Sequence, residues 1–202
     1  MKTKLIGLFI TVITLSAFTT FDDKGKIVKV EVFKKMIDTI GLTFDMPEGY
    51  KETYVKENGD LYYAFAIKNT KEDFEVRYSI WSLKPDFEEY RKCKLDSTHC
   101  VMVNPNNNYQ GRAEANVLNM TAGQNANIGA FPSGAVKEEF NADAGGSSFF
   151  VLNCEFGKGY KYGHMVYLHK DGIADVIITY LDNDKSKHSE LMDVPFHSLK
   201  FK

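Results

Sequence analysis

An alternating run at residues 74–83 constrains the fold of this chain more than any other feature. Apolar side chains would share one face of an extended segment there, namely Phe74, Val76, Tyr78 and Ile80. The opposite face would carry Glu75, Arg77, Ser79 and Trp81. Since side chains alternate across a β-strand, this pattern predicts a strand that turns one face toward a core.

Two turn sequences predict antiparallel hairpins. Asn58-Gly59 separates the runs 50–56 and 61–68, and an Asn-Gly pair readily takes the positive φ values of a tight hairpin turn. Lys170-Asp171-Gly172 separates 161–169 from 173–181 in the same way. Further strands are predicted at 40–46, 147–155 and 196–201.

Helical patterns are interspersed with these strands. Pro85 opens a predicted helix at 85–94, because proline is favoured in a first turn. Ala113, Val117 and Met120 have helical spacing within 112–121, and shorter helices are predicted at 134–141 and 185–193. With 44% hydrophobic residues the chain is globular, and the order of elements predicts one α+β domain with a mainly antiparallel sheet covered by helices.

The first 21 residues have the pattern of a secretory signal peptide. Lys2 and Lys4 precede an uncharged apolar run at 5–18, and small residues follow before Asp22. A membrane anchor or a buried strand is the alternative interpretation. We therefore expect a signal peptide at 1–21, an N-terminal extension at 22–37 and one domain at 38–202. The chain would be exported, either to the periplasm or to the medium, without a permanent membrane span.

The charge of the chain argues against a nucleic-acid partner. There are 25 basic and 27 acidic side chains, and the formal net charge is −2. Loss of Lys2 and Lys4 with the signal peptide would leave 23 basic side chains against 27 acidic ones, a net charge of −4. Proteins that bind nucleic acids carry a basic surface, so we expect neither nucleic acid nor another polyanion as a partner.

Three cysteines permit at most one internal disulfide. Cys93 and Cys100 lie close together in the sequence, at a predicted helix end and the loop after it, and they are the favoured pair. Two alternatives stay open, which are three reduced cysteines or a bridge from Cys154 to one of the other two. A disulfide scaffold is not expected, because a domain of this length can bury its own core.

Several short motifs resemble the PsbP-like superfamily. They are the segment 41–50, which ends in Pro47-Glu48-Gly49-Tyr50, the run 141–145 after a short helix, the strand around Tyr162 with the turn 169–172, and the ending 196–201. This resemblance spans residues 38–202 and implies an α/β/α sandwich, in which helices cover both faces of the central sheet. The superfamily consists chiefly of accessory and binding proteins, so the resemblance implies no particular activity. The lipid-anchoring cysteine of many bacterial members is missing here.

The sequence contains no complete motif for catalysis or metal binding. His164 and His169 would face opposite sides of a strand, and neither Cys-x-x-Cys nor His-x-x-x-His occurs. A calcium loop at 182–193 would have Lys187 where a glycine is needed and Asp193 in place of glutamate. Cys154 alternates with apolar residues, which predicts a buried, unreactive thiol. We therefore expect no cofactor, no bound metal and no enzymatic activity.

A binding role is the interpretation that remains. Trp81 shares a strand face with polar residues, so we expect it to be partly exposed on a contact surface with Arg77 and Tyr162. The leading hypothesis is an exported accessory domain that binds another envelope or secreted protein. The alternatives are a small-molecule or glycan binder with an aromatic groove, and a hydrolase with a site near Cys154 and His164. The sequence does not predict the oligomeric state.

Overall fold

The computed structural model describes residues 25–95, 99–124 and 127–202. The signal peptide predicted at 1–21 lies outside the described residues, as do residues 22–24 of the predicted extension. The helices within the described ranges are α1 (Val30–Asp38), α2 (Lys84–Leu95), α3 (Tyr109–Met120), α4 (Ser133–Phe140) and α5 (His188–Asp193). Two short 3-10 helices are η1 (Pro105–Asn107) and η2 (Glu155–Gly157).

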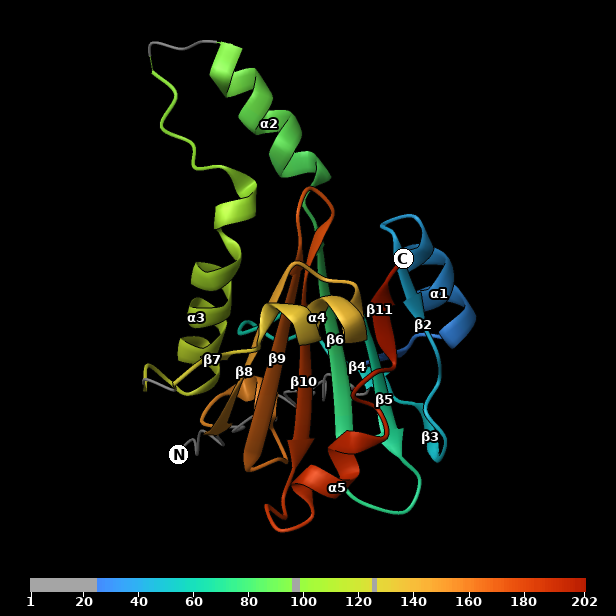
Figure 1. Ribbon diagram of the computed structural model, residues 1–202. Coiled ribbons are helices and arrows are strands. Elements are labelled where there is room, and N and C mark those ends of the chain that lie inside the picture. The colour runs from blue at the N-terminus through green and yellow to red at the C-terminus, as the bar shows by residue number, and fades with distance from the viewer. Residues whose placement is uncertain (1–24, 96–98, 125–126) are drawn as a thin grey trace, which may run out of the picture.

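A seven-stranded antiparallel sheet forms the centre of the molecule (Figure 1). Its strands, in spatial order, are β3 (Tyr50–Glu52), β5 (Phe65–Asn69), β6 (Glu75–Ser82), β10 (Ala174–Asp182), β9 (Tyr162–Lys170), β8 (Ala144–Val151) and β7 (Gly129–Ala130). Two small ladders pair β1 (Lys26–Ile27) with β4 (Tyr54–Val55) and β2 (Leu42–Phe44) with β11 (Leu199–Phe201). The α+β class and the antiparallel sheet expected from the sequence are confirmed.

The central strand β10 is buried along its whole length. Its neighbours are β6 and β9, and Ile178 lies opposite Tyr78 on one side and Val166 on the other. A strand that is covered on both faces has no solvent side and therefore needs no polar alternation. The run Val176-Ile177-Ile178 fits this position.

One face of the sheet is covered by α1, α4, α5 and the β2–β11 ladder. Phe33 of α1 stacks on Phe65 with their ring centroids 4.3 Å apart, and both side chains are fully buried. Val136 of α4 and Met192 of α5 belong to the same apolar cluster. Within the part of residues 22–37 that is described, α1 is helical and its apolar face lies in this core, so the packed fold begins before residue 38.

The other face of the sheet is covered by α3 and η2. Ala113, Val117 and Met120 of α3 are buried there, at the spacing that predicted the helix. This layer also buries Glu75, Arg77 and Ser79 of β6. Trp81 on this face is partly exposed, as expected, but Arg77 is not part of an exposed contact surface, because η2 and α3 pack over this face.

The Asn58-Gly59 hairpin is only partly as expected. β3 and β5 pair antiparallel, with Glu52 opposite Ile67, but neither strand reaches the Asn-Gly pair. Instead Asn58 Oδ1 accepts hydrogen bonds from the backbone N–H groups of Asp60 and Leu61, at 3.0 and 2.9 Å. An asparagine side chain that accepts from the backbone two and three residues later stabilises a wider loop. This loop takes the place of the expected two-residue turn.

Candidate functional site

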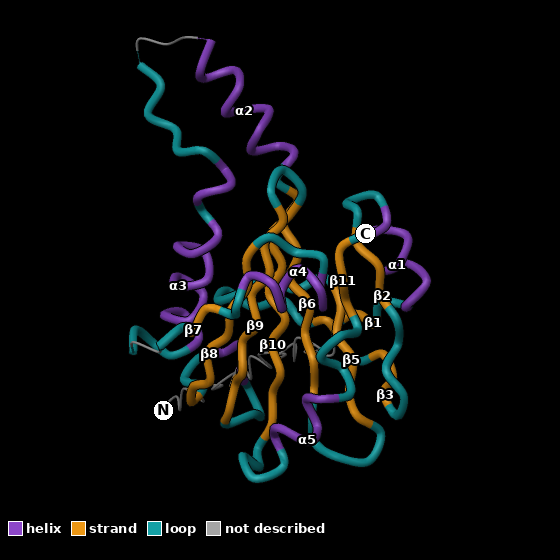
Figure 2. The backbone as a smooth tube through the Cα atoms, in the orientation of Figure 1, coloured by secondary structure: helices purple, strands orange, loops and turns teal. Residues whose placement is uncertain are grey.

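Helix α2 projects from the end of β6 away from the sheet, and the chain then returns toward α3 (Figures 1 and 2). None of the α2 side chains is buried. The helix is stabilised locally, because Asp86 lies in its first turn and Lys92 and Lys94 lie in its last turn, where each charge complements the helix dipole. We call α2 and the returning residues 99–104 the finger.

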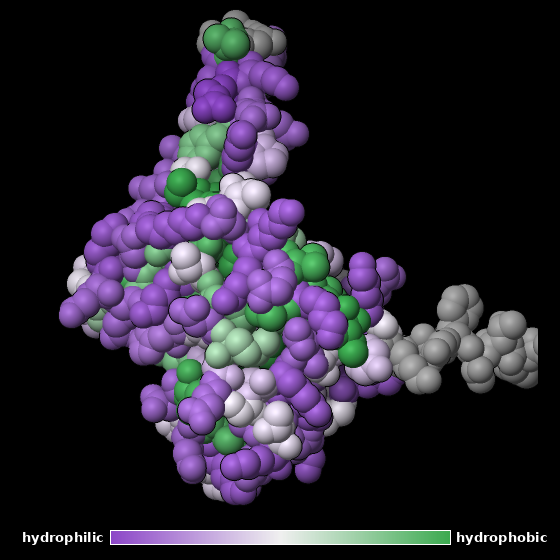
Figure 3. All heavy atoms as spheres, turned by 90° about the vertical axis from the view of Figure 1, so that its right-hand side faces the viewer, coloured by the Kyte–Doolittle hydropathy of each residue, from purple (hydrophilic) through white to green (hydrophobic). Residues whose placement is uncertain are grey.

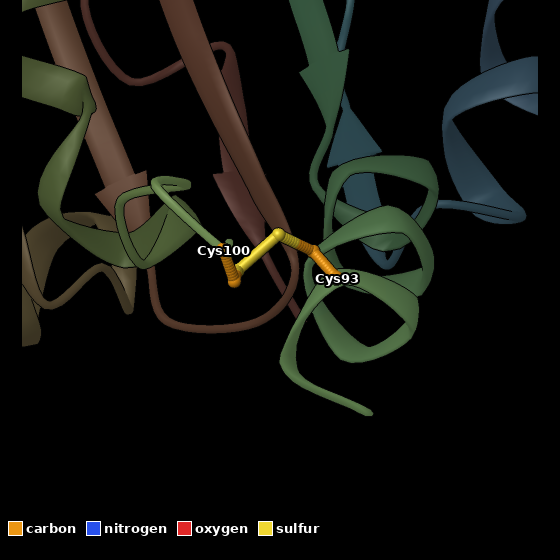
Figure 4. The surroundings of a disulfide bond; sticks show 2 residues. All are labelled: Cys93 and Cys100. Atoms are coloured by element: carbon orange, nitrogen blue, oxygen red, sulfur yellow. A yellow bond between two sulfur atoms is a disulfide. The ribbon is translucent and has the colours of Figure 1, made fainter. Parts of the chain in front are cut away.

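A disulfide joins the two sides of the finger. Cys93 lies in the last turns of α2 and Cys100 lies on the returning segment, with Cα atoms 5.3 Å apart (Figure 4). Closing so short a loop contributes about 2–3 kcal/mol in the chain-entropy model, because it restricts the unfolded chain. The bridge therefore holds in place a segment that the hydrophobic core does not hold.

Apolar side chains gather near this disulfide. Leu95 is 89% exposed, Val101 is 92% exposed and Val103 is 58% exposed. The end of the projection shows hydrophobic surface among mostly hydrophilic residues (Figure 3). Arg91, Lys92 and Lys94 are exposed on the same part of the finger. Large apolar side chains that stay in water beside a fixed scaffold are typical of a binding surface.

A groove of about 360 Å³ lies at the base of the finger. Its apolar lining includes Ile40, Phe87 and Ile173, which come from the α1–β2 connection, from α2 and from the turn between β9 and β10. Lys84 and Arg91 of α2 also line it. We call this pocket the root groove. An apolar side chain of a binding partner would fit this lining. An acidic residue next to it in the partner would lie close to Lys84 and Arg91.

Arg112 of α3 ties the base of the finger to the sheet. Its Nε donates to Asp175 Oδ2 at 2.9 Å, and its guanidinium lies over the Trp81 ring, 5.2 Å from the centroid. Its Nη2 lies 3.7 Å from Asp86 Oδ2 in the first turn of α2. One side chain thus connects α2 and α3 with β6 and β10.

His169 extends this network. Its Nδ1 lies 2.6 Å from Asp175 Oδ1 and its Nε2 lies 2.9 Å from Asp171 Oδ1. Because ionised carboxylates only accept hydrogen bonds, this geometry favours the positively charged imidazole, in which both ring nitrogens donate. Burial acts to lower the pKa of His169, but the hydrogen bonds and charges of Asp175 and Asp171 outweigh burial and raise it above 6.5. Tyr109 stacks on the ring with centroids 4.4 Å apart.

The three residues expected to form one contact surface are not together. Trp81 is partly buried beneath Arg112, and Arg77 is 6% exposed. Tyr162 lies on the opposite face of the sheet, where its ring stacks against Phe149 with centroids 5.8 Å apart. This follows from strand alternation, which places Tyr162 on the face of Val166 and α5. A single binding surface made of Trp81, Arg77 and Tyr162 is therefore a wrong prediction.

Cys154 and His164 are also on different faces. Cys154 packs against the cluster beneath α3, and burial raises the pKa of its thiol. His164 faces α5, where its Nδ1 lies 3.1 Å from His188 Nε2. Burial, followed by the charge of His188, lowers the pKa of His164 to about 4. A cysteine–histidine dyad cannot form across the sheet, because a nucleophile and its base must lie within hydrogen-bond reach.

The exposed tip of the finger and the root groove were missed from the sequence. Phe87, Tyr90 and Lys94 have the spacing of one helical face, yet none of them is buried. A signal for this was present in the sequence. Residues 84–94 contain no Val, Leu, Ile or Met, whereas Leu95 lies between the two cysteines and Val101, Met102 and Val103 follow Cys100. A helix without an aliphatic stripe has little with which to pack on a core.

In the described ranges, no three or more His, Cys, Asp or Glu side chains are grouped so that they could hold a metal ion. None of the helices in these ranges has the length and apolar composition to cross a membrane. No protein-family model matches the chain, and a search of curated proteins found no match.

Proposed function

We propose that this chain is an exported, non-enzymatic accessory protein that binds another envelope or secreted protein through the finger and the root groove. The observation that carries the proposal is the exposure of Leu95 and Val101 beside the Cys93–Cys100 bridge. A leader-like N-terminus and a disulfide both fit an exported protein.

The energetics of the finger favour a binding role. Burying one leucine or valine side chain stabilises a complex by about 1.5–3 kcal/mol, before the cost of association is subtracted. Since the disulfide already restricts the finger, little further ordering is needed when a partner binds. The exposed apolar side chains thus offer favourable burial at a low entropic cost.

The charges of the site suggest what the partner presents. Lys84 and Arg91 line the root groove, and Lys92 and Lys94 follow along the finger. We expect a protein segment that inserts an apolar side chain into the groove and has acidic residues next to it. Complementary charge of this kind increases the association rate and selects against basic partners.

The PsbP-like assignment belongs to the same proposal. The antiparallel sheet, with α3 on one face and α1, α4 and α5 on the other, is compatible with the α/β/α sandwich that the resemblance implies. The segments 41–50 and 196–201, which carry part of the resemblance, lie side by side through the pairing of β2 with β11. An accessory role fits a superfamily of that kind.

Site-specific photo-crosslinking in the cells that produce the chain tests this proposal. A photoreactive residue would replace Phe87 in the root groove or Val101 on the finger, and a matched control would replace Val151, which is 59% exposed on β8. We expect the same protein to be crosslinked from positions 87 and 101 and not from 151. Crosslinks to lipid alone, no crosslink at either position, or equal crosslinking from all three would contradict the proposal.

A further inference from the structure

A second pocket lies away from the finger, near the beginning of β6. It has a volume of about 320 Å³ and is bounded by the β3–β4 region, by β5 and β6, and by residues 158–160. Its charged lining consists of Lys56, Lys68, Asp73, Glu75, Arg77 and Lys158. Arg77 is near the start of β6, whereas α2 follows the end of that strand (Figure 1). We call this cavity the Arg77 pocket.

Positive charge exceeds negative charge in this lining. Both carboxylates already have a cationic partner, since Lys68 Nζ lies 2.7 Å from Asp73 Oδ1 and Arg77 Nε lies 2.6 Å from Glu75 Oε1. Lys56 adds a further cation to the lining. An anion could therefore enter without displacing an existing carboxylate, and the surrounding field would favour it.

Arg77 is fixed before any ligand arrives. Its guanidinium lies between two aromatic rings, 4.8 Å from the Tyr63 centroid and 4.6 Å from the Phe156 centroid. It also donates to Glu75 and to the carbonyl oxygen of Phe156. A guanidinium held in this way keeps its donors oriented, so a ligand oxyanion would meet a preorganised group at low entropic cost.

Two tyrosines complete the lining. Tyr160 donates from its hydroxyl to Glu75 Oε2 at 3.2 Å, and Tyr54 is 42% exposed at the edge of the pocket. Aromatic side chains offer an apolar surface for the body of a small molecule, while cations bind its charged group. A volume near 320 Å³ is at the lower end for ligand pockets, which suits a molecule of about monosaccharide size.

We propose that the Arg77 pocket binds a small anionic ligand of about monosaccharide size, whose carboxylate or phosphate group contacts Arg77 and Lys56. This activity is independent of protein binding by the finger, because the two sites share no lining residue.

Calorimetric titration of the protein purified from producing cells tests the proposal. The probes are glucose 6-phosphate, glucuronate and inorganic phosphate, with glucose as the neutral control. We expect at least one anionic probe to bind, with an affinity that falls as salt is added, and glucose not to bind. Binding of glucose as tight as that of the anions, or no binding of any probe at about 10 mM, would overturn the proposal.

Matched variants locate the site. Lys56→Gln should weaken the anionic probe about tenfold, because it removes a charge-assisted contact, while Lys35→Gln on α1 should leave the affinity unchanged. Arg77→Lys keeps the charge but loses the planar fork, and it should weaken binding as well. Since Arg77 is buried and that variant can lose stability, Lys56→Gln decides the matter. An unchanged affinity in Lys56→Gln would show that the anion binds elsewhere.

Discussion

Cys93 and Cys100 are bonded across the finger, with their Cα atoms 5.3 Å apart, and they join a helix that buries no side chain to the segment that returns to α3. The core of the protein lies on the two faces of the sheet, away from this bridge. The order of the finger therefore depends on a covalent link and on contacts at its base.

Replacing both cysteines by serine should loosen the finger and leave the sheet intact. We expect faster amide exchange in α2 and residues 99–104 and unchanged exchange in β9 and β10, because different parts of a folded domain can open independently. Hydrogen exchange followed by mass spectrometry measures this. Uniformly faster exchange across β9 and β10 would mean that the bridge stabilises the whole domain.

Arg112→Met should destabilise the protein by about 2–3 kcal/mol. Asp175 is only 3% exposed, and the substitution removes its ion pair with Arg112. His169 is then the remaining partner of this buried carboxylate. Arg91→Met at an exposed position of α2 is the control and should change the unfolding free energy by less than about 0.5 kcal/mol. Equal effects of the two substitutions in urea unfolding would argue against the Arg112 network.

His169 should make the protein less stable at alkaline pH. The pKa of His169 is raised in the folded state above 6.5, so its contribution is fully present below pH 6.5 and is lost as pH rises through the folded pKa. His169→Gln cannot be charged, and in this variant the decline above pH 6.5 should be smaller than in the native chain. Unfolding free energies measured between neutral and alkaline pH check this, and an identical decline in both proteins would refute it.

His164 should act in the opposite direction at acidic pH. Its pKa is lowered from 6.5 to about 4 in the folded state, so its contribution is present above pH 6.5 and is lost as pH falls through about 4. We expect a loss of about 2 kcal/mol over this range, since one pKa unit corresponds to about 1.4 kcal/mol and partial exposure reduces the effect. In His164→Gln the loss should be smaller. An unchanged acid profile would contradict this assignment.

Much of the sheet could be predicted because its signals are local. The alternation at 74–83 and the turn at 170–172 each depend on neighbouring residues, and both are found as β6 and the β9–β10 connection. The spacing of Ala113, Val117 and Met120 likewise identified the buried face of α3.

The candidate sites could not be predicted because they depend on long-range packing. The burial of Arg77 follows from η2, which is far away in the sequence, since the Phe156 ring and carbonyl contact the guanidinium. The root groove combines Ile40, Phe87 and Ile173 from three separate segments. A single strand pattern shows which residues share a face, but it does not show whether another element covers that face.

The most direct test of the central claim is the affinity of the crosslinked partner for Val101→Asp, with Val151→Asp as the matched control. Val101 and Val151 are both exposed valines, at 92% and 59%, so neither substitution should lower the melting temperature. If the finger is the binding surface, the Val101 variant should bind the partner at least about tenfold more weakly and the Val151 variant should bind as the native chain does. Equal affinities of all three proteins would contradict the claim that the finger binds the partner.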